Sequence, residues 1–419
     1  MSNTKQLKVN TIALMVIQFL NYALPFITLP YVSRIFSVDK FGLIFYAQVI
    51  MDYFWRFVMF GFDLSGVRTI ARNSNNQKRV GNDFSAILTA QFIFLAIGFL
   101  LLILLISFIP KFRIDWLVYL LTYIGLLGQI LIVTWFYQGM EKMKFITFLN
   151  IITRVSFCIL IFVCIKKPQD YILYPLFNSI SYIVAGIVSL IFIRKIFNIK
   201  YTLPTLKRLI LTIQYSSQFF ITKIGIALYR QTNAFILGIM TSTTLVAYYV
   251  AADKIFWAVL SLYFTFINAL FPYMTKNKDV IFFKKMLKYL IIFASLASLF
   301  LCFASKYLIL IFYSDKYLEA IRILQIFSLS FAFYVFVDTL GMPLLGAFGY
   351  IKETNQGYIL GGIYNIIGLA ILYWLNNITI YSVAILVSST YLVMFIHRIY
   401  YVKKYKLLNI KENLWNSKN

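Results

Sequence analysis

The sequence contains few charged residues, few cysteines and almost no histidine. Of its 419 residues, 13% are charged and one is histidine, whereas about 25% of the residues of a soluble protein are charged. So few charged side chains cannot cover two or three soluble domains, which excludes the soluble enzyme folds. Cys158, Cys164 and Cys302 all lie in apolar runs, so we expect neither a disulfide framework nor a thiolate metal site.

Apolar residues are abundant instead. Hydrophobic residues make up 61% of the chain, and its mean hydropathy is +0.82. About 20 apolar residues in a helix cross the roughly 30 Å of a bilayer core, and about twelve such runs occur, which predicts an all-α integral membrane protein. The predicted spans are residues 9–31, 41–62, 84–109, 116–140, 145–165, 171–193, 213–240, 245–271, 289–313, 323–348 and two helices within 356–396, separated by a turn at Asn376 and Asn377.

The basic residues indicate how the spans are oriented. Of 39 lysines and arginines, 25 fall in the loops and termini of one side, six of them in the C-terminal tail from Arg398 onward. Nine fall on the other side and five within spans. Because cytoplasmic loops carry the excess of basic residues, we expect both termini to be cytoplasmic. The net charge of +25 is then an orientation signal, and no nucleic-acid partner is expected.

The longest polar linker divides the chain near its middle, at residues 194–208. We expect two lobes of six helices each, an N-terminal lobe of residues 1–200 and a C-terminal lobe of residues 201–419. A faint internal repeat, residues 41–47 against 246–252, is typical of transporters built from duplicated halves. A chance match between aromatic-rich apolar runs is the alternative.

Catalytic chemistry has little support. The single histidine, His397, lies at the end of the last predicted span and fits an interfacial residue, and no histidine or carboxylate cluster has metal-ligand spacing. An enzyme acting on lipid-linked sugars needs acidic or histidine residues on sizeable extracytoplasmic loops, and these loops are short. We therefore expect a transporter with no catalytic residue, metal or cofactor.

The charges within spans are the informative residues. Each costs about 2.5 to 3.5 kcal/mol at a helix centre and tends to face a protein or water-filled interior. Five are basic and three acidic, so a fully ionised interior carries a net positive charge, which suits an anionic ligand. They are Asp52, Arg56, Arg154, Lys223, Arg230, Asp253, Lys254 and Asp338.

Their spacing forms polar faces on corresponding helices of the two halves. Gln48, Asp52 and Arg56 recur every four residues, with Asp52 and Arg56 in the favourable order for an ion pair, so a structural bridge is the alternative. Ser216, Lys223 and Arg230 recur every seven residues, and such a stripe can line a cavity.

The first and eighth predicted spans add further polar residues. Lys254 shares a face with Ser261, Thr265 and Asn268, and the first span carries Gln18 and Asn21. The alternatives are interhelical hydrogen bonds for Gln18 and Asn21, snorkelling for Lys223 and Arg230, and pairing of Asp253 with a neighbouring base. We predict pyrophosphate contacts at Arg56, Lys223, Arg230 and Lys254, supported in the cavity by Gln18, Asn21, Asp52, Arg154, Asp253 and Asp338.

Several segments resemble the Wzx-type O-antigen flippases, members of the polysaccharide transporter family. This family belongs to the superfamily that includes the multidrug and toxin extrusion pumps and the peptidoglycan lipid flippases. The similar segments are LPFITLPYVSR at residues 24–34, Phe41-Gly42, GFDLS at 61–65 with Arg68, WFYQGME at 135–141 and AYYVAADK at 247–254.

The resemblance implies twelve helices in two six-helix lobes around a central cavity. It also implies alternating-access transfer of an oligosaccharide on undecaprenyl pyrophosphate, from the cytoplasmic to the periplasmic leaflet of the bacterial inner membrane. Membrane lipid is an expected partner, as are the polymerase and chain-length regulator of the same pathway. Where relatives often carry an acid, this chain has Asn233, which cannot carry a proton for ion coupling.

Two other functions stay open. A cation-coupled multidrug exporter would favour buried carboxylates over a net positive cavity. A membrane polymerase or ligase acting on the same lipid-linked sugars would favour a large periplasmic loop bearing arginine and histidine.

Overall fold

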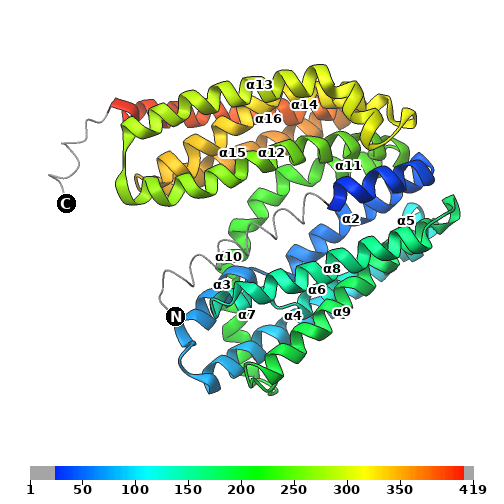
Figure 1. The fold of residues 1–419 in the computed structure, drawn as a ribbon, viewed down its shortest axis with the longest axis vertical. Helices are drawn as coiled ribbons and strands as arrows, with labels where there is room; N and C mark the ends of the chain where they lie inside the picture. Colours follow the sequence, from blue (N-terminus) through cyan, green and yellow to red (C-terminus); the bar gives the residue numbers. More distant parts are fainter. Residues whose placement is uncertain (1–23, 410–419) are drawn as a thin grey trace. The chain divides into compact units, whose positions relative to one another are not determined.

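The computed structural model describes residues 24–409, without the side chains of residues 221–230, 265, 268, 269 and 409. All of the regular structure in the described part of the chain is helical, which confirms the predicted all-α class (Figure 1). Most of the first predicted span lies outside the described residues, as do Gln18 and Asn21.

The chain divides into two compact units, Met1–Ile224 and Gly225–Asn419. The boundary lies inside helix α10 (Leu206–Arg230), later than residue 200, where the sequence places the change of lobe. Residues 24–35 are helical. The other helices of the first unit are α2 (Val38–Met59), α3 (Phe62–Asn73), α4 (Gln77–Phe108), α5 (Pro110–Ile114), α6 (Trp116–Leu131), α7 (Thr134–Gly139), α8 (Met143–Cys164), η1 (Pro168–Ile172) and α9 (Leu173–Lys195).

Small residues allow close helix packing within the first unit. Helix α9 lies along both α6 and α8 (Figure 1). At the α6–α9 contact, a Cβ atom on Gly128 would lie 2.4 Å from the backbone nitrogen of Ile183. Membrane helices gain little from the hydrophobic effect against each other, so such close van der Waals packing stabilises the unit.

The second unit is built around one central helix. It contains α11 (Thr232–Met240), α12 (Thr243–Asn277), α13 (Val280–Phe312), η2 (Asp315–Tyr317), α14 (Glu319–Thr339), the π-helix η3 (Leu340–Gly346), α15 (Ile351–Trp374), α16 (Ile380–Lys404) and η4 (Leu407–Asn409). Helix α14 packs against α12, α13 and α16 (Figure 1). The buried side chains of Phe327 and Phe331 contact Phe256 of α12 across this core.

Ten helices of the described residues are long and apolar enough to cross a membrane. Large apolar side chains point outward from several of them, such as Leu100 on α4 and Phe303 on α13, which are 63% and 78% exposed. Outward apolar faces of this kind are expected where a helix contacts lipid. Two predicted spans are not among the ten: residues 9–31 fall mainly outside the described part, and residues 213–240 correspond to α10 and α11.

Candidate functional site

The first predicted polar face ends at a sharp break between α2 and α3. Phe60 has φ 39° and donates its backbone N–H to the Arg56 carbonyl, and Gly61 follows with φ 79°. A Cβ atom on Gly61 would lie 2.7 Å from the Ser216 carbonyl oxygen and 2.8 Å from the Phe220 nitrogen, both backbone atoms of α10. Glycine is required here both by its backbone conformation and by this close approach. The first residues of α3 after the break, Asp63 and Leu64, line the same cavity as Asp52 and Arg56 of α2.

The short helix α7 forms the opposite wall. It starts after Val133, whose φ is 45°, so the predicted span 116–140 is interrupted there. The Trp135 ring is buried and packs on Gly66 of α3, where a Cβ would lie 3.0 Å from the ring. Gly139 approaches Ile70 of α3 in the same way. Trp135 and Gly139 of the WFYQGME segment thus pack α7 against α3. Gln138 of the same segment lines the space between α7, α3 and α2.

A cavity of about 450 Å³ results, which we call the α2–α3–α7 pocket. Its lining combines charged, amide, hydroxyl and aromatic side chains. The lining residues are Asp52, Trp55, Arg56, Met59, Gly61, Asp63, Leu64, Thr134, Gln138 and Phe220. The lining contains one basic and two acidic side chains, so the formal charge of this pocket is −1 if all three are ionised. The net positive interior expected from the sequence is therefore not a property of this pocket.

The charges at the α2–α3 break lie at favourable helix ends. Arg56 is in the last turn of α2, and Asp63 is in the first turn of α3. Interactions with helix dipoles stabilise such charges by about 0.3 to 1 kcal/mol each. Arg56 is half-buried and Asp52 is exposed, so both can reach a ligand in the pocket.

The polar face of α2 continues away from the pocket. Gln48 and Arg154, the latter on α8, both lie close enough to Tyr174 of α9 to affect it electrostatically. Asp52 and Arg56 thus line the pocket directly, whereas Arg154 lies near the far end of the same helical face.

The predicted residues of α12 and α14 make separate contacts. Asp253 on α12 accepts a hydrogen bond of 3.0 Å from the Trp257 indole one turn later, and Lys254 beside it is half-buried. Asp338 on α14 lies elsewhere and accepts a 3.3 Å hydrogen bond from the Tyr358 hydroxyl of α15. The side chains of Lys223 and Arg230 lie outside the described residues.

Arg398 is a buried charge that is not among the predicted site residues. The loop count places it in the C-terminal tail, and this is wrong, because α16 extends to Lys404 and Arg398 is fully buried. Its Nη1 donates a 3.1 Å hydrogen bond to the Glu353 carbonyl, and its guanidinium lies 4.9 Å from the Tyr358 ring centroid. Its positive charge also acts on Asp338. The length of the final apolar run, which continues through Val402, was the available signal.

The helix termini beside Arg398 are joined by tyrosines. The Tyr405 hydroxyl donates a 2.8 Å hydrogen bond to Glu353, and its ring stacks on Tyr350 with centroids 3.9 Å apart. The hydrogen bond to the Glu353 carboxylate raises the pKa of Tyr405 to about 12. Tyr405 therefore remains a donor at physiological pH. Among the described side chains, no three His, Cys, Asp or Glu residues are grouped as metal ligands would be.

Comparisons with known proteins agree with this architecture. The family described as "Polysaccharide biosynthesis protein" matches residues 7–278. Two provisionally named O-antigen transporters are each 27% identical to the chain. The one from Shigella dysenteriae aligns over 68% of this chain and 72% of its own length. The one from Escherichia coli (strain K12) aligns over 69% and 71%.

Solved structures share the fold at low sequence identity. The lipid II flippase MurJ, in an inward closed conformation, superimposes with a TM-score of 0.71 at 16% identity, covering 96% of this chain and 89% of MurJ. An inward-facing multidrug resistance transporter of the MATE family gives a TM-score of 0.67 at 12% identity, covering 96% and 99%. The family match covers well over half of the sequence. The chain therefore belongs to the polysaccharide biosynthesis protein family, as a multi-pass membrane transporter that resembles the Wzx-type flippases.

Proposed function

We propose that the chain moves an oligosaccharide linked to undecaprenyl pyrophosphate across the bacterial inner membrane. The observation that carries this proposal is the α2–α3–α7 pocket, in which α2, α3 and α7 bring Arg56, Asp63 and Gln138 together between membrane-spanning helices. The named functions of the relatives, O-antigen transport and lipid II flipping, give the substrate class.

The lining of the pocket suits a glycosyl phosphate head group. The planar donors of Arg56 match phosphate oxygens. Carboxylates, an amide and a hydroxyl, as in Asp52, Asp63, Gln138 and Thr134, can bind sugar hydroxyls from several directions. Because this pocket contains two acidic side chains and one basic side chain, it binds mainly the sugar portion of the head group. Arg56 binds the nearest phosphate.

Transport proceeds by alternating access between an N-terminal lobe, residues 1–200, and a C-terminal lobe, residues 201–419. Lys223, Arg230 and Lys254 supply further positive charge for the pyrophosphate, and both termini lie in the cytoplasm. The polymerase and the chain-length regulator of the same pathway act on the exported unit.

Lipopolysaccharide from a deletion strain tests this function. Without transport, no repeat unit reaches the periplasm, so electrophoresis should show lipid A core alone, and a plasmid copy should restore the ladder. An assembled repeat unit on undecaprenyl pyrophosphate should accumulate. Core carrying a single unit would instead identify a polymerase, because single units would still be exported and attached.

A second candidate is a cation-coupled multidrug exporter, favoured by the two carboxylates and single base of the pocket. For this function, deletion should increase sensitivity to cationic drugs and leave the lipopolysaccharide ladder intact. The two measurements on one strain separate the candidates, since each predicts a change in a different readout.

A further inference from the structure

A second cavity in the first unit lies at the ends of its helices. It has a volume of about 460 Å³, and we call it the α3–α4–α10 pocket. Most of its lining side chains are polar. The lining residues are Ser65, Thr69, Asp83, Ile87, Thr205, Lys207, Arg208, Leu211, Thr212, Tyr215 and Ser216. Asp83 lies in the second turn of α4, and Thr205, Lys207 and Arg208 lie at the start of α10.

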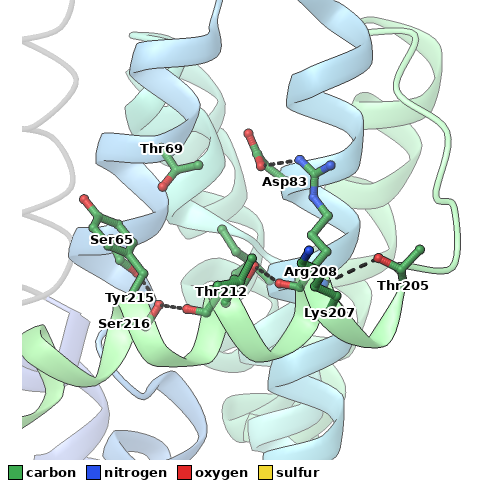
Figure 2. Close-up of a pocket in the computed structure, with 11 residues that line it drawn as sticks. Ser65, Thr69, Asp83, Thr205, Lys207, Arg208, Thr212, Tyr215 and Ser216 are labelled. Atoms are coloured by element: carbon green, nitrogen blue, oxygen red, sulfur yellow. Dashed lines mark hydrogen bonds and ion pairs between the residues drawn. The ribbon is translucent and has the colours of Figure 1, made fainter.

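An ion pair orients the arginine of this pocket. Arg208 rises from α10 and its Nη2 lies 2.7 Å from Asp83 Oδ1, while Thr69 faces the same space (Figure 2). The other Asp83 oxygen accepts a 2.6 Å hydrogen bond from Asn73. Asp83 is thus held from two sides and engages one nitrogen of Arg208. The remaining guanidinium donors are positioned to bind an anion.

The surroundings of the pocket are strongly basic. Segments 68–83 and 200–208 contain seven basic residues and a single acid, Asp83. The bases are Arg68, Arg72, Lys78, Arg79, Lys200, Lys207 and Arg208. The Lys207 side chain is exposed and lines the pocket. Such an excess of positive charge attracts phosphate groups at a membrane surface.

The pocket lies at the boundary between polar and apolar sequence. Asp83 is the last charged residue of α4 before the apolar run that starts at Phe84, and Arg208 immediately precedes Leu209 on α10. Beside it, Leu206 and Leu211 are 72% and 55% exposed. A cavity that contains charged and hydroxyl groups and has an exposed apolar border suits an amphiphile whose head group enters the cavity and whose chains stay in lipid.

We infer that the α3–α4–α10 pocket binds the phosphate head group of an anionic phospholipid. Lys207 and Arg208 neutralise the phosphate, the hydroxyl of Thr69 hydrogen-bonds to it or to a glycerol head group, and the acyl chains lie along Leu206 and Leu211. This site is separate from the substrate pocket lined by Arg56 and does not depend on the transport function proposed above.

Binding of short-chain phosphatidylglycerol to the purified full-length protein in neutral detergent tests the inference. Retained lipid is measured by native mass spectrometry during titration. We expect saturable binding that weakens by about fivefold in Lys207→Gln, as for loss of one charge-assisted contact. Lys200→Gln, an exposed base of the same region that does not line the pocket, should bind like the unmodified protein. Equal weakening in both variants would refute a defined site.

The Asp83→Asn variant tests the sign of the ligand charge. Asparagine keeps an oxygen for Arg208 but removes the negative charge that opposes a phosphate, so affinity should rise. A fall in affinity in Asp83→Asn together with unchanged affinity in Lys207→Gln would indicate a cation or neutral sugar as ligand and overturn the inference. Competition decides the source of the phosphate. Displacement by equimolar inorganic phosphate, or stronger binding of a short polyprenyl phosphate, would reject the phospholipid assignment.

Discussion

Gly61 fixes the geometry of the substrate pocket at the scale of one residue. An alanine at this position would have to adopt a left-handed backbone, which costs about 1 to 2 kcal/mol. Its Cβ would also overlap the α10 backbone at Ser216 and Phe220. We therefore predict a lower thermal unfolding midpoint for Gly61→Ala in detergent. Gly349→Ala is the matched control, because Gly349 has φ 92° but nothing within 4 Å of a Cβ. Equal losses in the two variants would show that the close approach to α10 contributes nothing.

Arg398 stabilises the second unit through groups on two other helices. Arg398 is fully buried and donates to the Glu353 carbonyl, and leaving such a buried acceptor without its donor costs about 1 to 3 kcal/mol. Arg398→Met should therefore strongly lower the unfolding midpoint, whereas Lys403→Met, exposed on the same helix, should change it little. Adding Asp338→Asn to Arg398→Met should recover part of the loss. Strictly additive effects would contradict the electrostatic coupling between Asp338 and Arg398.

At the scale of helices, four bases are predicted to contact pyrophosphate. Alanine at Arg56, Lys223, Arg230 or Lys254 should reduce O-antigen display at unchanged protein level. Lysine at Arg56 or Arg230 should keep part of the activity, if charge matters more than a bidentate geometry. Arg72→Ala, an exposed position at the end of α3, serves as control. Normal display from all four variants would refute a cationic substrate site.

The helices of this protein are largely predictable from its sequence, but their interruptions are not. The apolar run at 84–109 corresponds closely to the greater part of α4, since an uncharged run of that length has no other stable state in lipid. The break at Val133 has no sequence signal, because a β-branched residue rarely adopts a positive φ.

The pocket itself could be predicted only in part. The four-residue spacing of Asp52 and Arg56 places both on one helical face, and both do line the α2–α3–α7 pocket. Asp63 and Gln138 join them through the break at Gly61 and the packing of Trp135 on Gly66. These are contacts between distant segments, on which local periodicity carries no information.

At the scale of the whole molecule, the charge asymmetry predicts topology. Leaving out Arg398, which is fully buried, changes the count on the basic side from 25 to 24, against nine on the other. The bias is preserved, so reporter fusions after Lys195, where α9 ends, and at the C-terminus should both report cytoplasm. A fusion after Lys167, between α8 and η1, should report periplasm. A periplasmic signal from either of the first two would overturn the span count.

The position of α10 has a consequence for recombination between relatives. Its first half packs in the first unit, through the 2.7 Å contact between Ser65 and Ser216 and the stacking of Phe220 on Phe60. A chimaera joined in the loop 196–205 would set α10 of one protein against the α2–α3 corner of another and disturb both contacts. A junction just after Phe220 keeps this part of the helix with its native neighbours. A chimaera between relatives should therefore be joined inside α10 and not in the long loop before it. The two halves of the chain cannot be exchanged between relatives at that loop without disturbing these contacts.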